Sequence, residues 1–134
     1  MFINISNHPF PAWSDLQRDA AMKLGGDIVD LPFPLIDPEM GTEQLDILVD
    51  QYYGKIMEML RSGKNTPCQE NTDTRSAVMV QGEYTFVYRL VKRLEQKGIL
   101  CVSACSRREV EEERKGDTVV KKSLFQFLQF RRYF

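Results

Sequence analysis

The sequence predicts an α/β fold: a mainly parallel sheet with helices on both faces, followed by a C-terminal antiparallel β-hairpin. Short apolar segments alternate with longer segments whose apolar residues recur every three or four positions. Such alternation favours a parallel sheet covered on both faces. After residue 108 it gives way to two β-prone segments around a glycine turn. A length of 134 residues fits one domain, 1–134.

The composition is typical of a soluble globular protein, with a formal net charge of -1. Without a basic excess, long nucleic acid is not an expected partner, whereas a small anion needs only a local basic patch. No apolar run is long enough to span a membrane. The segment from Met1 to Ile5 has no basic lead, so it is typical of a strand and not of a signal peptide. We therefore expect a cytoplasmic protein that does not bind membranes.

The cysteines Cys68, Cys101 and Cys105 are odd in number and have no zinc-site spacing. We therefore expect neither a disulfide nor a metal site, and no cofactor. The chain also lacks a P-loop, a dinucleotide-binding glycine motif and a nucleophile elbow, so the enzyme classes that need them are excluded.

The first part of the chain predicts a strand, a helix and a second strand. The strand Phe2 to Ile5 is followed by a proline-containing loop. The pattern Ser14-Asp15-Leu16-Gln17 resembles a capping box, which predicts a helix from about Asp15 to Leu24, ended by Gly25-Gly26. The second strand is expected at Asp27 to Leu31. The residues expected on the buried side of this helix are Leu16, Ala20 and Leu24.

The middle of the chain predicts the longest helix, capped by Thr42 and running to Arg61. Residues 62–76 are polar and aperiodic, so we expect a mobile surface loop. The apolar run from Ala77 to Val80 predicts a strand, and a helix to Lys97 follows, closed by Gly98. The inward side of this helix is expected to carry Phe86, Val87, Leu90, Val91 and Leu94.

The C-terminal part predicts an apolar strand from Ile99 to Cys105 and then the hairpin, residues 108–131, with its turn at Lys115-Gly116-Asp117. Acidic side chains of the first arm should face Lys121 and Lys122 of the second. These acidic residues are Glu109, Glu111, Glu112 and Glu113.

Polar residues follow three of the four predicted parallel strands, where open α/β sheets bind ligands. They are Ser6-Asn7-His8, Gln81-Gly82-Glu83, and the segment from Ser103 to Ser106-Arg107-Arg108. We expect them to form one rim. Gly82 would let a ligand approach the backbone, and the helix that follows offers free N–H groups to a phosphate or ribose. Arginine pairs with phosphate, and amides of Asn or Gln can read an adenine edge.

Several of these residues also have purely structural interpretations. His8, the only histidine, is the candidate for proton transfer or a hydrogen-bonded loop residue. Glu83 can accept a proton or cap its helix, and the two arginines can pair with nearby glutamates. Trp13 and Tyr84 can stack on bases, although Trp13 is expected to pack against the first helical turn.

Four segments resemble a known family: Met1 to Pro9, Val80 to Thr85, Ser103 to Arg108, and Phe130 to Tyr133. They are similar to small, stand-alone CRISPR-associated proteins of type III antiviral defence systems, and the likeness covers nearly the whole chain except the Ser62 to Ser76 loop. The resemblance implies a CARF-like (CRISPR-associated Rossmann) fold, a homodimer, and binding of cyclic oligoadenylate messengers. Some members of the family cleave the ring as ring nucleases.

The resemblance implies that this chain binds and cleaves cyclic oligoadenylate without a metal, giving linear products with a 2′,3′-cyclic phosphate. Cyclic tetra-adenylate is the expected ring. The expected catalytic residues are His8, Glu83 and Arg107. The expected ligand-binding residues are Ser6, Asn7, Gln81, Gly82, Tyr84, Thr85, Ser106 and Arg108. The alternatives are a protein that binds the ring without cutting it, and an unrelated nucleotide enzyme or protein-interaction domain.

Overall fold

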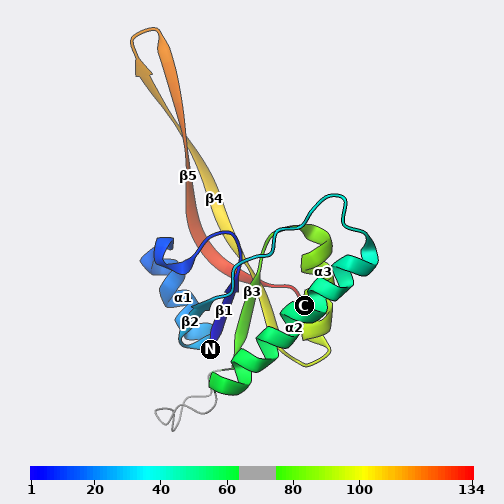
Figure 1. The fold of residues 1–134 in the computed structure, drawn as a ribbon. Helices are drawn as coiled ribbons and strands as arrows, with labels where there is room; N and C mark the ends of the chain where they lie inside the picture. The colour runs from blue at the N-terminus through cyan, green and yellow to red at the C-terminus, as the bar shows by residue number, and fades with distance from the viewer. Residues whose placement is uncertain (64–74) are drawn as a thin grey trace.

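A computed structural model describes residues 1–63 and 75–134 and contains a five-stranded sheet in the order β2-β1-β3-β4-β5 (Figure 1). β1, β2, β3 and β4 are parallel, and β5 is antiparallel to β4. The predicted α/β class with a C-terminal antiparallel pair is therefore confirmed. The strands are β1 (Phe2–Ile5), β2 (Ile28–Asp30), β3 (Ala77–Val80), β4 (Leu100–Lys115) and β5 (Thr118–Arg132).

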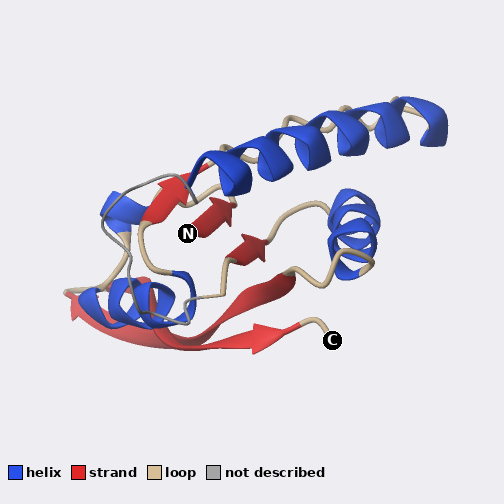
Figure 2. Ribbon diagram, turned by 90° about the horizontal axis from the view of Figure 1, so that it is seen from below, coloured by secondary structure: helices blue, strands red, loops and turns tan. Residues whose placement is uncertain are grey.

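Three helices cover the sheet: α1 (Asp15–Gly25), α2 (Thr42–Gly63) and α3 (Tyr84–Glu95). α1 lies on one side, and α2 and α3 lie together on the other (Figures 1 and 2). Alternate residues of each strand accordingly enter different cores. Ile3 and Val78 pack in the core beneath α2 and α3, whereas Phe2 and Met79 pack in the core beneath α1.

The start of α1 was predicted correctly, because the Ser14 hydroxyl accepts a hydrogen bond from the Gln17 backbone N–H (3.3 Å). Its predicted buried side was only partly correct. Leu24 packs against the core beneath α1, but Leu16 is 57% exposed, and the fully buried residues of the helix are Ala21 and Gly25. The helix approaches the first strand so closely that a side chain at Gly25 would lie 2.8 Å from the Met1 carbonyl oxygen. Glycine is therefore the residue that fits there, because any side chain would meet the backbone of Met1.

The long helix α2 forms where it was predicted, but Thr42 is its first helical residue and not its cap. Its buried apolar residues are Leu45, Val49, Tyr52, Ile56 and Leu60. The backbone N–H of Gly41, just before it, donates to the Gln44 side chain (3.0 Å). Of the loop predicted at 62–76, the first two residues belong to α2 and the last two lead into β3. The remainder, including Cys68, lies outside the described residues.

The prediction that the fourth strand ends at Cys105 was wrong, because β4 continues to Lys115 and pairs with β5 throughout. The pairing shifts between Cys105 and Ser106, which leaves Leu128 as an extra residue in β5. Ser106, Arg107 and Arg108 are therefore strand residues and not a loop. β4 and β5 leave the body of the molecule as a long two-stranded ribbon (Figure 1).

The tight turn of the ribbon contains the predicted glycine. Gly116 has a φ of 64°, and Lys115 pairs with Thr118. Opposite charges face each other in the register as expected, with Glu111 opposite Lys122 and Glu112 opposite Lys121, and the second of these pairs forms an ion pair (3.8 Å).

Candidate functional site

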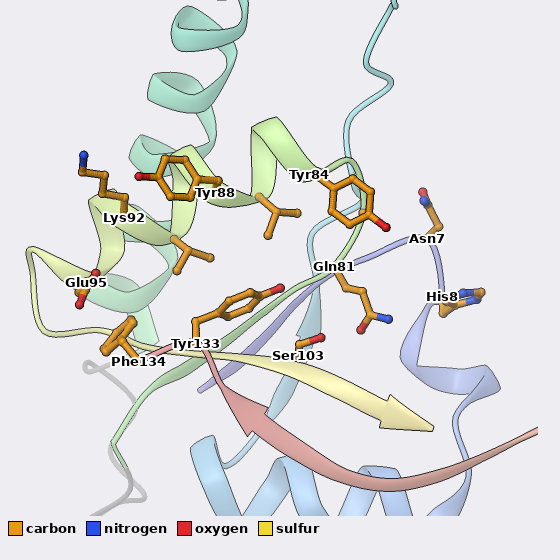
Figure 3. A pocket seen from close by; sticks show the side chains of 13 residues that line it. Asn7, His8, Gln81, Tyr84, Tyr88, Lys92, Glu95, Ser103, Tyr133 and Phe134 are labelled. Atoms are coloured by element: carbon orange, nitrogen blue, oxygen red, sulfur yellow. The ribbon is translucent and has the colours of Figure 1, made fainter. Parts of the chain in front are cut away.

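The chain reverses direction across the sheet at the boundary between β1 and β3. The chain leaves β1 through α1 toward β2, and it leaves β3 through α3 toward β4, on the opposite side. The carboxyl ends of these two strands therefore flank a crevice, which is where open α/β sheets bind ligands. A groove of about 910 Å³ opens there (Figure 3). Its walls are the loops after β1 and β3, the exposed flank of α3, Ser103 of β4, and the two residues that follow β5.

The backbone ladder between β3 and β4 stops one step early at this groove. Its last pair is Met79 with Val102. The N–H of Gln81 donates to β1, so Val80, the residue before it, faces β4. A regular parallel ladder would next bond the Ala104 N–H to the Val80 carbonyl oxygen. The structure does not make this bond.

Two side chains take the place of this missing backbone hydrogen bond. The Ala104 N–H donates to Gln81 Oε1 (3.1 Å), and the Tyr133 hydroxyl donates to the Val80 carbonyl oxygen (2.6 Å). Both backbone groups are therefore satisfied while β3 and β4 separate. Because a backbone N–H can only donate, Gln81 must turn its oxygen toward β4, which leaves its Nε2 donor free to meet a ligand. Gln81 and Tyr133 line the groove beside Ser103 (Figure 3).

Tyr133 remains a neutral hydrogen-bond donor over a wide pH range. Burial raises the pKa of its phenol above the usual value of 10.0, and the adjacent Ser103 hydroxyl offsets part of this rise. Tyr133 follows the end of β5, and its N–H donates to the Cys101 carbonyl oxygen (3.1 Å). Its side chain thus crosses β4 to reach β3.

The flank of α3 supplies an aromatic wall. Tyr84, Tyr88 and Lys92 follow one another at intervals of four residues, so they share one side of the helix. Tyr84 is 88% exposed, and the Lys92 ammonium lies 5.9 Å from the centre of the Tyr88 ring. A flat aromatic base can stack on such rings, and the ammonium can contact a phosphate.

The loop after β1 is held in place by hydrogen bonds from two side chains to one backbone carbonyl oxygen, that of His8. The His8 carbonyl oxygen accepts from Asn4 Nδ2 (2.9 Å) and from the Trp13 indole N–H (2.9 Å). The Ser6 hydroxyl is buried and donates to Asn4 Oδ1 (2.8 Å), so Ser6 shapes the loop and does not line the groove. Trp13 is buried against Phe2 and Phe130, so it cannot stack on a base.

Asn7 and His8 themselves line the groove, and both side chains are exposed. They lie at one end of the lining residues in Figure 3, where the His8 ring points away from Gln81. His8 is therefore placed at the margin of the groove.

Glu83 caps α3. Its carboxylate accepts from the backbone N–H groups of Thr85 (3.1 Å) and Phe86 (2.8 Å), and from the Thr85 hydroxyl. The Phe86 bond is the main reason that the pKa of Glu83 is lowered, followed by the Thr85 side chain. Neither Glu83 nor Thr85 lines the groove. The expectation that this helix start offers free N–H groups to a phosphate was therefore wrong, because Glu83 already occupies them.

Gly82 lines the groove, but its lack of a side chain has a different cause from the one predicted. A Cβ atom at this position would lie 2.4 Å from the Phe33 ring. Phe33 packs edge-on against Phe86 of α3, with ring centres 5.2 Å apart. Glycine is therefore needed here for packing.

Ser106, Arg107 and Arg108 do not line the groove, because they lie on the ribbon beyond the shift in pairing. Arg108 Nη2 donates to the Ser123 hydroxyl across the ribbon (3.0 Å). Of the three predicted parts of the rim, the structure thus brings together those around Asn7 and Gln81, joined by Ser103, and not the arginines.

Seven lining residues were not predicted as part of the site: Val87, Tyr88, Val91, Lys92, Glu95, Tyr133 and Phe134. The spacing of Tyr84, Tyr88 and Lys92 was a usable signal. The last two residues carry no local signal, since their place depends on where β5 ends. Across residues 1–63 and 75–134, no three His, Cys, Asp or Glu side chains gather closely enough to hold a metal ion. No helix in the described parts of the chain could cross a membrane.

A family model described as "Uncharacterized protein MJ1673 family" matches residues 1–131, so the chain belongs to that family. Searches of curated proteins and of solved structures found no match.

Proposed function

We propose that this member of the MJ1673 family binds a cyclic oligoadenylate in the groove, with cyclic tetra-adenylate as the first ligand to test. The observation that carries the proposal is the convergence of Asn7, Gln81 and Tyr84, from the ends of two strands, on one groove of about 910 Å³. The resemblance to CARF-like proteins of type III CRISPR systems supports the same ligand.

The groove offers the groups that an adenine nucleotide needs. The free Nε2 donor of Gln81 suits the N7 acceptor of adenine, and the exposed amide of Asn7 can serve a second polar edge. Tyr84 and Tyr88 offer rings for stacking. Lys92 supplies the positive charge on this wall, while Glu95 beside it is negative. Stacking and amide contacts, more than charge, would therefore provide the affinity.

A homodimer belongs to the proposal, because a ring of identical nucleotides suits two identical grooves related by a two-fold axis. A cytoplasmic location in antiviral defence also belongs to it. The homodimer follows from the resemblance and from the symmetry of the ligand, and the role in antiviral defence follows from the resemblance.

Cleavage would be an in-line attack of a ribose 2′-hydroxyl on the adjacent phosphorus. The 2′-oxygen loses its proton and bonds to phosphorus, the bond from phosphorus to the 5′-oxygen breaks, and that oxygen takes a proton. The products are linear with a 2′,3′-cyclic phosphate. His8 is the proton-transfer candidate that lines the groove. Glu83 and Arg107, the other expected catalytic residues, lie outside the groove, which favours a second candidate function: binding without cleavage.

The experiment is incubation of the purified protein with cyclic tetra-adenylate in EDTA, with binding measured by calorimetry and products separated by chromatography. Binding with ring opening that His8→Ala abolishes supports the nuclease. Binding with an intact ring after long incubation with excess protein supports the second candidate function, binding without cleavage. If neither cyclic tetra-adenylate nor cyclic hexa-adenylate binds, the proposal is rejected in favour of another nucleotide enzyme or a protein-interaction domain.

A further inference from the structure

A second groove lies at the opposite edge of the sheet, where β3 and β4 begin. Its volume is about 820 Å³, which is within the range of small-molecule sites. Its walls come from the end of α2, the residues just before β3, the turn between α3 and β4, and the end of β5 with Phe134.

Positive charge gathers around this second groove. Arg61, Arg75, Lys97 and Arg132 all line it, and none of the described residues that line it is acidic. The chain as a whole has a formal net charge of -1, so its composition does not account for four positive charges in one place. A cleft lined by charges of one sign raises the local concentration of ligands of the opposite sign. The second groove therefore favours an anion with several charges.

These four cations have no acidic partner. The arginines of α1 and α3 each form an ion pair with an aspartate: Arg18 with Asp15, Arg89 with Asp46, and Arg93 with Asp50. Within residues 1–63 and 75–134, the four cations of the second groove form no ion pair.

Helix dipoles explain only two of the four cations. Arg61 lies in the last turn of α2, and Lys97 follows the end of α3, where the negative end of each helix dipole favours a cation. Arg75 precedes β3 and Arg132 ends β5, so neither has a helix end to stabilise. Their positions at the second groove are better explained by a bound anion.

The remainder of the lining is largely apolar. Leu60 and Leu100 line the second groove, and so does Phe134, whose side chain is 48% exposed. An exposed aromatic ring can stack on a flat base. Guanidinium groups bind phosphate through paired hydrogen bonds. The ligand that fits both features has a flat organic part and several phosphate groups.

We propose that the second groove binds a nucleoside triphosphate, with its phosphates at Arg75 and Arg132 and its base against Phe134. The site lies at the amino edge of the sheet, away from the edge where open α/β sheets bind ligands. It is therefore distinct from the groove beside Gln81, and it rests on charge and lining chemistry alone.

The experiment is calorimetric titration of ATP in EDTA into the wild type, Arg75→Ala and Arg132→Ala. Both side chains are exposed, and neither supports a helix end, so circular dichroism should show an unchanged fold. The wild type should bind ATP, and each variant should bind about tenfold more weakly, as for a lost charged hydrogen bond. Adenosine and inorganic triphosphate should each bind the wild type more weakly than ATP, because each lacks one part of the ligand.

The matched controls are Arg131→Ala and Gln81→Ala. Arg131 precedes Arg132 in β5, points to the opposite face of the sheet and lines neither groove, so its removal makes the same charge change outside the site. Gln81 lines only the first of the two grooves. Both variants should bind ATP as the wild type does.

Four results would each overturn the proposal. They are no ATP binding by the wild type, an equal loss of affinity in Arg131→Ala, an equal loss in Gln81→Ala, which would place ATP in the first groove, and inorganic triphosphate that binds as tightly as ATP. None of these outcomes depends on whether the first groove binds cyclic oligoadenylate.

Discussion

The Tyr133 hydroxyl lies 2.6 Å from the Val80 carbonyl oxygen and takes the place of a backbone hydrogen bond between β3 and β4. This contact frees the Ala104 N–H for Gln81, which in turn fixes the amide orientation of Gln81. Sheet geometry and the chemistry of the groove are thus linked through one phenol. The consequence can be tested without knowing the ligand.

Removing that hydroxyl should let the two strands close. In Tyr133→Phe the Val80 carbonyl oxygen loses its partner, so the Ala104 N–H should move to it and release the Gln81 side chain. We expect a loss of about 1 kcal/mol in the free energy of unfolding, as for one hydrogen bond. The amide resonance of Ala104 should shift in NMR spectra. An unchanged Ala104 amide would show that Tyr133 does not hold the strands apart.

The protein should lose stability in alkali. Burial, and secondarily Glu95, raises the pKa of the Cys101 thiol from 9.0 to about 12, and burial also raises the pKa of Tyr133. The unfolded chain therefore releases these protons at lower pH than the folded chain does. The free energy of unfolding should be steady below pH 9.0 and fall as pH rises through 9.0 toward 12. Denaturant titrations should show a shallower fall in Cys101→Ala; an equal slope would contradict the assignment.

Glu83→Gln should affect the stability of α3 and not the chemistry of the groove. Losing the charged cap should lower the free energy of unfolding by about 1 kcal/mol near neutral pH. Since the pKa of Glu83 is lowered, the advantage of the wild type should be present above pH 4.5 and shrink as pH falls below it. Ring binding and any cleavage should be unchanged. Lost cleavage with normal affinity would instead make Glu83 catalytic.

Gly82→Ala should destabilise the protein by about 1–3 kcal/mol, because the new methyl group meets the Phe33 ring. Gly54→Ala is the matched control, since a Cβ at that position in α2 would meet no atom within 4 Å apart from its chain neighbours and the backbone of its own helix. The control should be neutral or slightly stabilising. A double-mutant cycle with Phe33→Ala should show strong coupling to position 82. Additive effects would exclude the proposed contact.

Much of the fold could be read from local patterns. The strands Phe2–Ile5 and Ala77–Val80 are fully buried and, apart from Asn4, apolar, and both of their bounds were predicted correctly. The inward residues of α3 were also correct, because an amphipathic helix on a sheet shows its period directly. The ribbon was only partly predicted, since a two-stranded element that is exposed on both sides needs no apolar alternation.

The site was predictable where polar residues directly follow buried strands, as Asn7 and Gln81 do. The prediction of the site was wrong where the role of a residue depends on partners that are distant in the sequence. Glu83 and Gly82 looked available in sequence, but α3 uses one as its cap and Phe33 fills the space beside the other. Tyr133 gave no signal, because only the end of β5 brings it to Val80.

The most direct test of the account is calorimetric titration of cyclic tetra-adenylate into the wild type, Gln81→Ala and Arg108→Ala. Gln81 reaches into the groove, whereas Arg108 lies on the ribbon and bonds to Ser123. We predict binding by the wild type, a loss of about tenfold or more in Gln81→Ala, and unchanged affinity in Arg108→Ala. Absent binding by the wild type, or equal affinity in Gln81→Ala, would contradict the account.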